Sequence, residues 1–195
     1  MTALRLHGYL VSTFTRTAAM ACIEKGVPYE LVPIAYGSAE HAALHPFVRI
    51  PVLEHGDTVV FETLAITSHI DAAFDGPPLQ PSPGPARTRM LEWLSLCSDY
   101  VYRDVVRGLP RKRPPTEDEL GAARQALERV DAMLDAPLLA GESLSLADLY
   151  LAPQISNARE KAPEVLASLD ATETWFAKLA ERESFRRTSY DPEAL

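Results

Sequence analysis

The sequence predicts two halves of different class, an α/β half followed by an all-helical half. The first 76 residues alternate strand-like and helix-like segments, whereas the last hundred or so carry apolar positions at helical spacing. Between them lies a proline-rich stretch, which cannot hold a helix because proline lacks the amide donor. We therefore expect an α/β domain over residues 1–76, a linker over 77–85 and a helical bundle domain over 86–195.

Strand, helix and strand follow one another at the start of the α/β half. Leu4–Gly8 predicts a strand, and Thr15–Lys25 predicts a helix that ends before Gly26, with Pro28 just beyond. Tyr29–Ile34 predicts the second strand. A strand, helix and strand within about 30 residues predict a right-handed βαβ unit with parallel pairing.

A hairpin and a helix complete the α/β half after a short irregular segment. Two apolar runs, Pro51–Leu53 and Val59–Phe61, flank a His-Gly-Asp turn and predict the hairpin. Thr63–Phe74 then predicts a helix. The expected order is βαβ, connector, ββα.

The residues beyond the linker predict bundle helices. Two segments each carry one apolar stripe at three- and four-residue steps. The stripes are Met90, Leu94, Cys97, Val101 and Val105, and then Leu120, Ala123, Leu127, Val130 and Leu134. Ser145–Asp148 is a helix-capping pattern, and a last helix is expected from about Thr172 to Glu183.

Composition and charge exclude several classes of function. The formal net charge of -8 argues against nucleic-acid binding, which depends on Lys and Arg, and we interpret the basic cluster 111–113 as a solvated turn. No apolar run approaches the roughly 18 residues of a membrane span. Met1–Arg5 lacks the layout of a signal peptide, so we expect a cytoplasmic protein without a membrane partner.

The two cysteines, Cys22 and Cys97, lie far apart and have neither a Cys-x-x-Cys pattern nor a histidine at a metal-ligand spacing. Both stand among apolar neighbours, where a thiol behaves as a small buried hydrophobe. We therefore expect neither a redox pair nor a metal site.

Four segments in this order resemble the cytosolic glutathione transferases, most of all the serine-type, phi-like members and their bacterial relatives. The segments are Ser12–Arg16, Glu24–Val32, His45–Leu53 and Phe61–Ile66. The resemblance covers nearly the whole chain. It implies a thioredoxin-like first half, a helical second half, glutathione as co-substrate without a metal, a role in detoxification, and a homodimer.

The ends of the predicted hairpin acquire a role through this resemblance. Pro51 matches the family's cis-proline, which turns the Ile50 backbone towards the cysteinyl main chain of glutathione. Glu62 and Thr63 match the pair that receives the γ-glutamyl end. Independently, a helix starting at Thr63 favours a carboxylate at its N-terminus, and Glu62 can accept from an ammonium. Without the resemblance, Thr63 reads more simply as a helix cap and Glu62 as a first-turn acid.

Other glutathione contacts follow the family pattern less closely. Arg49 occupies the position of a polar contact, although an exposed arginine is an equal alternative. Val48 replaces the usual glycine, and the shortened segment 35–43 lacks the family's His-Lys pair. His41 is then a weak candidate for the glycyl carboxylate, and we expect modest affinity.

Ser12 matches the family's active-site serine, which donates to the glutathione thiolate. Tyr9 and Thr13 are the other hydroxyl groups of the same loop and rank below it. Neither cysteine falls in this loop, which disfavours the thiol-exchange classes.

The electrophile pocket is expected between the two halves. Its candidates are Val11, Phe14, Tyr36, Tyr100, Tyr102 and Arg103.

The sequence leaves three functions open. The leading one is an enzyme in which bound glutathione thiolate attacks an electrophilic small molecule. A glutathione-dependent isomerase or dehalogenase shares the activated thiolate, and a non-catalytic binding module shares the fold. Ser12, Glu62 and Thr63 favour catalysis, whereas Val48 and the short connector favour altered chemistry.

Overall fold

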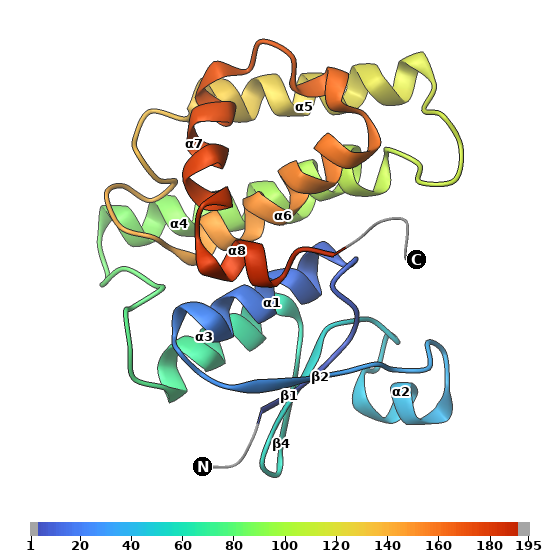
Figure 1. Cartoon of the computed structure of the whole chain (residues 1–195). Coiled ribbons are helices and arrows are strands. Elements are labelled where there is room, and N and C mark those ends of the chain that lie inside the picture. The colour runs from blue at the N-terminus through green and yellow to red at the C-terminus, as the bar shows by residue number, and fades with distance from the viewer. Residues whose placement is uncertain (1–3, 191–195) are drawn as a thin grey trace. The chain divides into compact units, whose positions relative to one another are not determined.

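The chain divides into two compact units. The computed structural model describes residues 4–190. Unit 1 comprises residues 1–79 and 183–195, and unit 2 comprises residues 80–182. Unit 1 is an α/β fold and unit 2 is all helical (Figure 1), so the predicted fold class is confirmed.

Unit 1 contains a four-stranded mixed sheet in the order β2-β1-β3-β4. Strands β1 (Leu4–His7) and β2 (Tyr29–Val32) are parallel, and the predicted helix between them is α1 (Thr13–Glu24). The predicted hairpin is β3 (Val52–His55) and β4 (Thr58–Phe61), and β3 also pairs antiparallel with β1.

Helices α1 and α3 (Thr63–Ala73) lie together on one side of the sheet (Figure 1). The core between them contains Leu6, Met20 and Ile66, each fully buried. The segment before the hairpin was expected to be irregular, but it contains the six-residue helix α2 (Ala39–Leu44). Ser38 caps this helix by accepting from the His41 N–H at 3.1 Å.

A buried ion pair fastens the end of α1 to the chain that leaves α3. The Lys25 ammonium lies 3.1 Å from the Asp71 carboxylate and also donates to the carbonyl oxygens of Gly76 and Pro77. Asp71 in turn accepts from the Leu79 N–H at 2.8 Å. These contacts explain why the first unit runs to residue 79, three residues into the expected linker.

The short helix α8 (Glu183–Arg187) belongs to unit 1, although the sequence pattern assigned its residues to the helical domain. Arg16, buried in α1, holds it by donating to the carbonyl oxygen of Phe185 and to the Thr188 and Ser189 hydroxyls. Its guanidinium also lies 4.1 Å from the centre of the Phe185 ring. Residues 191–195 of the expected domain lie outside the described residues.

Unit 2 is built around α6 (Leu146–Lys161), whose residues are buried along most of its length. The other helices are α4 (Pro85–Leu96), the π-helical η1 (Cys97–Arg107), α5 (Glu117–Met133), η2 (Pro163–Leu166) and α7 (Asp170–Ala180). Segment η1 continues α4, so the expected first bundle helix changes to π-helical geometry halfway along.

The predicted cap at the start of α6 is a buried hydrogen-bonded cluster. The Asp148 carboxylate accepts from the N–H groups of Ser145 and Leu139, each at 2.9 Å. It also accepts from the Ser145 hydroxyl at 2.9 Å and the Trp175 indole at 3.0 Å. Asp148 therefore joins the preceding loop, α6 and α7.

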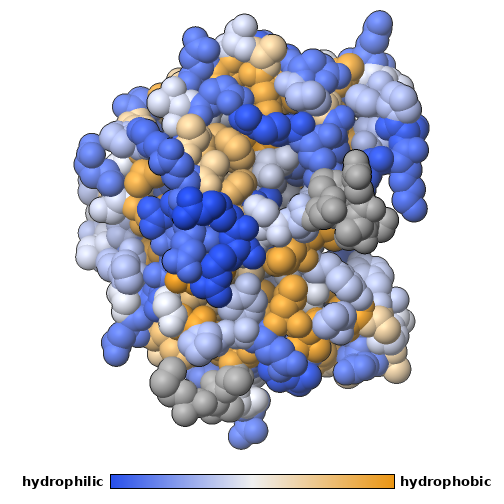
Figure 2. Space-filling model, viewed as in Figure 1, coloured by the Kyte–Doolittle hydropathy of each residue, from blue (hydrophilic) through white to orange (hydrophobic). Residues whose placement is uncertain are grey.

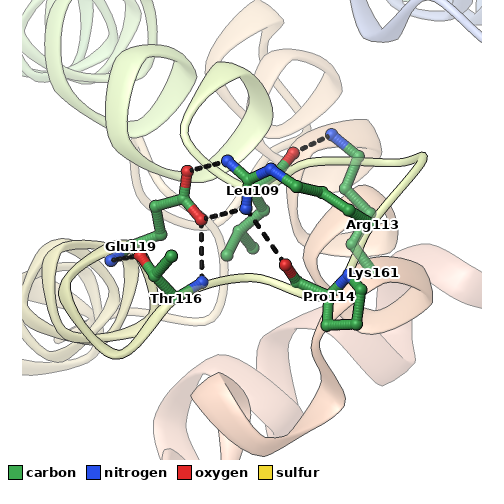
Figure 3. Close-up of polar contacts among 6 residues, drawn as sticks. All are labelled: Leu109, Arg113, Pro114, Thr116, Glu119 and Lys161. Atoms are coloured by element: carbon green, nitrogen blue, oxygen red, sulfur yellow. Dashed lines mark hydrogen bonds and ion pairs between the residues drawn. The ribbon is translucent and has the colours of Figure 1, made fainter.

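The loop between η1 and α5 carries the basic cluster. Figure 3 shows the Arg113 guanidinium, which donates two hydrogen bonds to the Glu119 carboxylate, at 2.6 and 2.8 Å. The Thr116 N–H donates to the same carboxylate. These donors lower the pKa of Glu119 to about 2. The Lys161 ammonium donates to the Leu109 carbonyl oxygen at 2.7 Å, and burial lowers its pKa to about 8.

Both cysteines are buried and unpaired by disulfide. Burial raises the pKa of the Cys22 thiol to about 12 and raises that of Cys97 further, so both behave as apolar side chains. Within residues 4–190, no group of three or more His, Cys, Asp or Glu could hold a metal ion. No helix in this described part is long and apolar enough to cross a membrane.

Candidate functional site

Strand register brings three of the predicted site segments to one edge of the sheet. His7, the last residue of β1, pairs with Val52, and Val52 pairs with Phe61, the last residue of β4. The loop after β1, the residues before β3 and the residues after β4 therefore emerge at the same edge. They contain Ser12, Ile50–Pro51 and Glu62–Thr63.

Ser12 is the N-cap of α1. Its backbone is extended, with φ -77° and ψ 121°, and its hydroxyl oxygen accepts from the Thr15 N–H at 3.3 Å. A hydroxyl that accepts through oxygen keeps its own hydrogen available for donation. The half-buried Ser12 hydroxyl thus lies beside the positive end of a twelve-residue helix.

The two neighbouring hydroxyl groups differ from Ser12 in their surroundings. The Tyr9 hydroxyl donates to the Ile34 carbonyl oxygen at 2.5 Å, so its hydrogen is already used. The Thr13 hydroxyl is buried, and no residue in the described part of the chain hydrogen-bonds it. Of these three residues, Ser12 is the one that is only half-buried and whose hydroxyl hydrogen is available for donation.

The backbone on each side of the edge adopts unusual geometry. The Ile50–Pro51 peptide bond is cis, as the resemblance implied. Glu62 has φ 68° and ψ 124°, a conformation that non-glycine residues rarely adopt. Its side chain is 68% exposed. Thr63, the first residue of α3, is buried.

Two histidines at the end of α2 face this edge, and the sequence reading missed one of them. His45 is buried; its Nδ1 accepts from the Phe47 N–H at 3.1 Å, and its Nε2 lies 3.6 Å from the Glu62 carboxylate. Burial is the main cause that lowers the pKa of His45. Residue spacing gave no signal for His45, because α2 spans only six residues and His45 follows its last residue with an extended backbone.

His41, the weak candidate for the glycyl carboxylate, is fully buried. Its Nδ1 accepts from the Gly37 N–H at 3.3 Å, and its Nε2 contacts the Arg49 carbonyl oxygen at 2.9 Å. Both ring nitrogens are therefore engaged by the backbone, which leaves no donor for a ligand carboxylate. The geometry gives His41 a structural role instead.

Arg49 is exposed and donates to the Tyr36 hydroxyl at 3.0 Å. The sequence reading assigned these two side chains to different subsites, glutathione for Arg49 and the electrophile for Tyr36. Their hydrogen bond joins the two groups into one exposed polar pair. Arg49 keeps donors for a ligand, because a guanidinium has five N–H groups.

The other electrophile-pocket candidates are divided between the units. Val11, Phe14 and Tyr36 belong to unit 1, and Tyr100, Tyr102 and Arg103 lie on η1 of unit 2. Their grouping into one pocket stays a prediction. The Arg103 guanidinium donates two hydrogen bonds to the Asp104 carboxylate, at 2.6 and 2.8 Å. This pairing lowers the pKa of the Asp104 carboxyl group and offsets the positive charge of Arg103.

Unit 2 also contains a cavity of about 230 Å³ that the sequence reading did not identify. Tyr100 and Met133 line it, together with apolar side chains of η1 and α5. Tyr100, which is also a predicted residue of the electrophile pocket, is thus a lining residue of this cavity. No sequence motif pointed to the cavity, whose lining also includes the charged side chains of Asp104 and Arg129.

Val48 has φ 51°, so the position does require the left-handed conformation that glycine adopts without strain. We expect Val48→Gly to raise the free energy of unfolding by about 0.5–1 kcal/mol. Relief of about 1–2 kcal/mol of strain exceeds the entropic cost of glycine, about 0.5–1 kcal/mol. Urea unfolding measures the change. Val48→Ala is the control, and a glycine variant less stable than the alanine variant contradicts the expectation.

An α/β unit with a cis-proline beside a helix N-terminus, followed by a helical unit, defines a class of thioredoxin-like two-domain proteins. The glutathione S-transferase N-terminal domain family matches residues 6–78, and the glutathione S-transferase C-terminal domain family matches residues 89–183. The chain therefore belongs to the glutathione S-transferase family.

Individual relatives agree with this assignment. The chain is 30% identical to glutathione S-transferase 3 of Zea mays, over 96% of this chain and 94% of that protein. It is 28% identical to a Pseudomonas putida glutathione S-transferase, over 84% of this chain and 79% of that protein. The crystal structure of glutathione transferase F7 from Populus trichocarpa matches with a TM-score of 0.85 at 25% identity, over 95% and 97% of the two chains.

Proposed function

We propose that this glutathione S-transferase lowers the pKa of the glutathione thiol through Ser12 and joins glutathione, through its sulfur, to an electrophilic small molecule. The observation that carries the proposal is the convergence of three segments at one sheet edge: the Ser12 loop, Ile50–Pro51 and Glu62–Thr63. Together they offer a hydroxyl donor, the backbone of Ile50 before the cis-proline, and an acidic residue at a helix start. A γ-glutamyl tripeptide thiol needs partners of these three kinds.

The glutathione thiol must lose its proton before it can attack an electrophile. A free thiol has a pKa of about 8.5, so only a few per cent is ionised near neutral pH. Lowering the pKa by about two units requires about 2.7 kcal/mol of preferential thiolate stabilisation. The Ser12 hydroxyl and the N-terminus of α1 are suited to share this work, because a charge-assisted hydrogen bond and a helix dipole both favour the anion.

The γ-glutamyl group has both an ammonium and a carboxylate. The exposed Glu62 carboxylate is suited to the ammonium, and the N-terminus of the eleven-residue helix α3 at Thr63 is suited to the carboxylate. The backbone of Ile50 is suited to pair with the cysteinyl main chain. Arg49 completes the proposed set as an exposed donor beside this backbone, and His41 is no longer part of it.

The second substrate is an electrophilic small molecule that the glutathione thiolate attacks. In the proposed reaction the thiolate forms a carbon–sulfur bond, and the electrophile either releases its leaving group or adds the thiolate across an activated double bond. The electrophile subsite remains the set Val11, Phe14, Tyr36, Tyr100, Tyr102 and Arg103. Detoxification of such compounds, together with the cytoplasmic location, stays a prediction.

A homodimer is part of the proposal. Large apolar side chains are exposed in each unit, among them Phe47 at 76% in unit 1, and Leu91 at 46% and Tyr100 at 50% in unit 2. The face drawn in Figure 2 is largely hydrophilic, with hydrophobic residues reaching the surface between the hydrophilic ones. Exposed apolar side chains that are scattered in this way are common on monomers, so the support for a homodimer is the family resemblance, which implies one.

Calorimetric titration with glutathione tests the proposed binding site. We expect saturable binding with a dissociation constant at or below about 1 mM, and Glu62→Gln should weaken it at least about tenfold because the ammonium loses its anionic partner. Asp57→Asn, at the exposed turn of the hairpin, is the matched control and should leave affinity unchanged. Absence of binding at millimolar glutathione would instead favour a non-catalytic binding module.

A further inference from the structure

The two buried histidines near the end of α2 share one pattern of hydrogen bonding. In each ring Nδ1 accepts a backbone N–H, from Gly37 to His41 and from Phe47 to His45. A neutral imidazole that accepts at one nitrogen carries its proton on the other. Both histidines are therefore the Nε2–H tautomer, each with one N–H directed away from its own helix.

The Nε2–H groups of His41 and His45 contact the two segments that flank the hairpin, one before β3 and one after β4. The Nε2–H of His41 donates to the Arg49 carbonyl oxygen at 2.9 Å, immediately before the Ile50–Pro51 peptide. The Nε2–H of His45 faces the Glu62 carboxylate at 3.6 Å, which is an electrostatic contact rather than a short hydrogen bond. One helix end thus supports both segments of the edge.

Glu62 is the residue that most needs such support. Its carboxylate is 68% exposed, and long exposed side chains sample several rotamers. The His45 ring cannot move freely with it, because the ring is 1% exposed, is fixed by the Phe47 N–H and packs on Phe61 with the ring centres 5.0 Å apart. His45 is therefore a fixed partner for a mobile carboxylate.

We propose that His45 is a positioning residue of the glutathione site, which orients the Glu62 carboxylate towards the ammonium of the γ-glutamyl group. This inference rests on the proposed function for the identity of the ligand. His41 acts in the same way on the Arg49 main chain. Neither histidine touches the ligand, and each acts through the group that its Nε2–H holds.

The charge state of His45 suits this role. Its pKa is lowered from 6.5, mainly by burial and further by His41 and Arg49, whereas Glu62 opposes the change. The neutral ring orients Glu62 without cancelling its negative charge, which stays available for an ammonium. Protonation would place an N–H at Nδ1 against the Phe47 N–H, so that two donors would face each other. Acid should therefore break the hydrogen bond between the Phe47 N–H and the His45 ring.

A double-mutant cycle on glutathione affinity tests the positioning role. His45→Leu should weaken binding about fivefold to tenfold in the wild-type background but less than about twofold in the Glu62→Gln background, because the interaction it serves is already gone. Equal losses in both backgrounds overturn the proposal. His45→Gln keeps a side-chain donor; it should recover part of the affinity, and it also serves if the leucine variant does not fold.

His69 provides the matched control. It is also partly buried and its pKa is also lowered by burial, but its Nε2 lies 3.0 Å from His55 at the other end of the hairpin. His69→Leu should therefore leave glutathione affinity unchanged in both backgrounds. A loss as large as that of His45→Leu would mean that any buried histidine of unit 1 matters, and the positioning role would be rejected.

A second readout does not depend on glutathione. Nitrogen-15 NMR of the imidazole rings should show His45 as the Nε2–H tautomer, with a titration midpoint below 6.5 that moves lower still in Glu62→Gln. The Nδ1–H tautomer, or a midpoint that Glu62→Gln leaves in place, overturns the inference. If these results hold while the wild type fails to bind glutathione, the proposed function fails, and the orienting contact must serve a different ligand.

Discussion

Replacing Ser12 by alanine is expected to lower the rate of glutathione conjugation about tenfold to a hundredfold while leaving glutathione affinity within about threefold of wild type. The hydroxyl stabilises the thiolate, which is the reacting form, whereas the tripeptide is held mainly at the hairpin ends. The helix dipole of α1 remains in the variant, so part of the activation survives. Steady-state kinetics with an aryl halide, combined with calorimetry, separates the two quantities.

The alanine variant also loses the N-cap of α1, since the Ser12 hydroxyl accepts from the Thr15 N–H. That loss costs about 1 kcal/mol of folding free energy and must not be mistaken for catalysis. Thr13→Val is the matched control, because it removes a neighbouring hydroxyl that no described residue hydrogen-bonds. Normal turnover in Ser12→Ala, with a large loss in Thr13→Val, would transfer the catalytic role to Thr13.

Replacing Asp148 by alanine is expected to have the largest effect on stability, about 3–5 kcal/mol. The carboxylate is fully buried and accepts from four donors, the Ser145 N–H and hydroxyl, the Leu139 N–H and the Trp175 indole. Removing it leaves those buried donors unsatisfied, at about 1–3 kcal/mol each before relaxation and hydration. Chemical unfolding of the purified variant measures the loss.

Asp170 provides the comparison for this variant. It also stands in the first turn of a helix, α7, but its side chain is exposed. Asp170→Ala should therefore cost less than about 1 kcal/mol, the range of a helix-dipole contact at the surface. Similar losses for the two variants would show that the buried network at Asp148 has no special weight in the folding of unit 2.

Local patterns predicted most elements because each one buries its own apolar face. The strand β1, the helix α1 and the hairpin follow from periodicity and turn residues, and their ends differ from expectation by a few residues at most. Helix α1 begins at Thr13, earlier than expected, because Ser12 caps it. Capping chemistry thus set a boundary that apolar spacing alone placed two residues too late.

The elements that local sequence patterns did not predict are either very short or held in place by residues far away in the sequence. Helix α2 spans six residues, too few for an apolar stripe to be recognised. Helix α8 spans five, and its place in unit 1 follows from Arg16, more than 160 positions earlier in the chain. The π-helical geometry of η1 was also invisible, because steps of four residues fit both helix types.

At the site, the sequence identified residues by family resemblance better than it identified their surroundings. The cis peptide before Pro51 came from the resemblance, since X-Pro bonds are cis in only about 5–6% of cases. The role of His45 could not be read, because it depends on which ring nitrogen the Phe47 N–H occupies. Such a choice is made by the folded backbone and leaves no mark on residue spacing.

Ultraviolet absorbance of the thiolate at saturating glutathione measures most directly whether the protein lowers the pKa of the bound glutathione thiol. We expect a titration midpoint of about 6 to 7 for the complex, against about 8.5 or above for the free thiol. Ser12→Ala should return the midpoint most of the way to the free value. A wild-type complex that titrates like free glutathione would contradict the account.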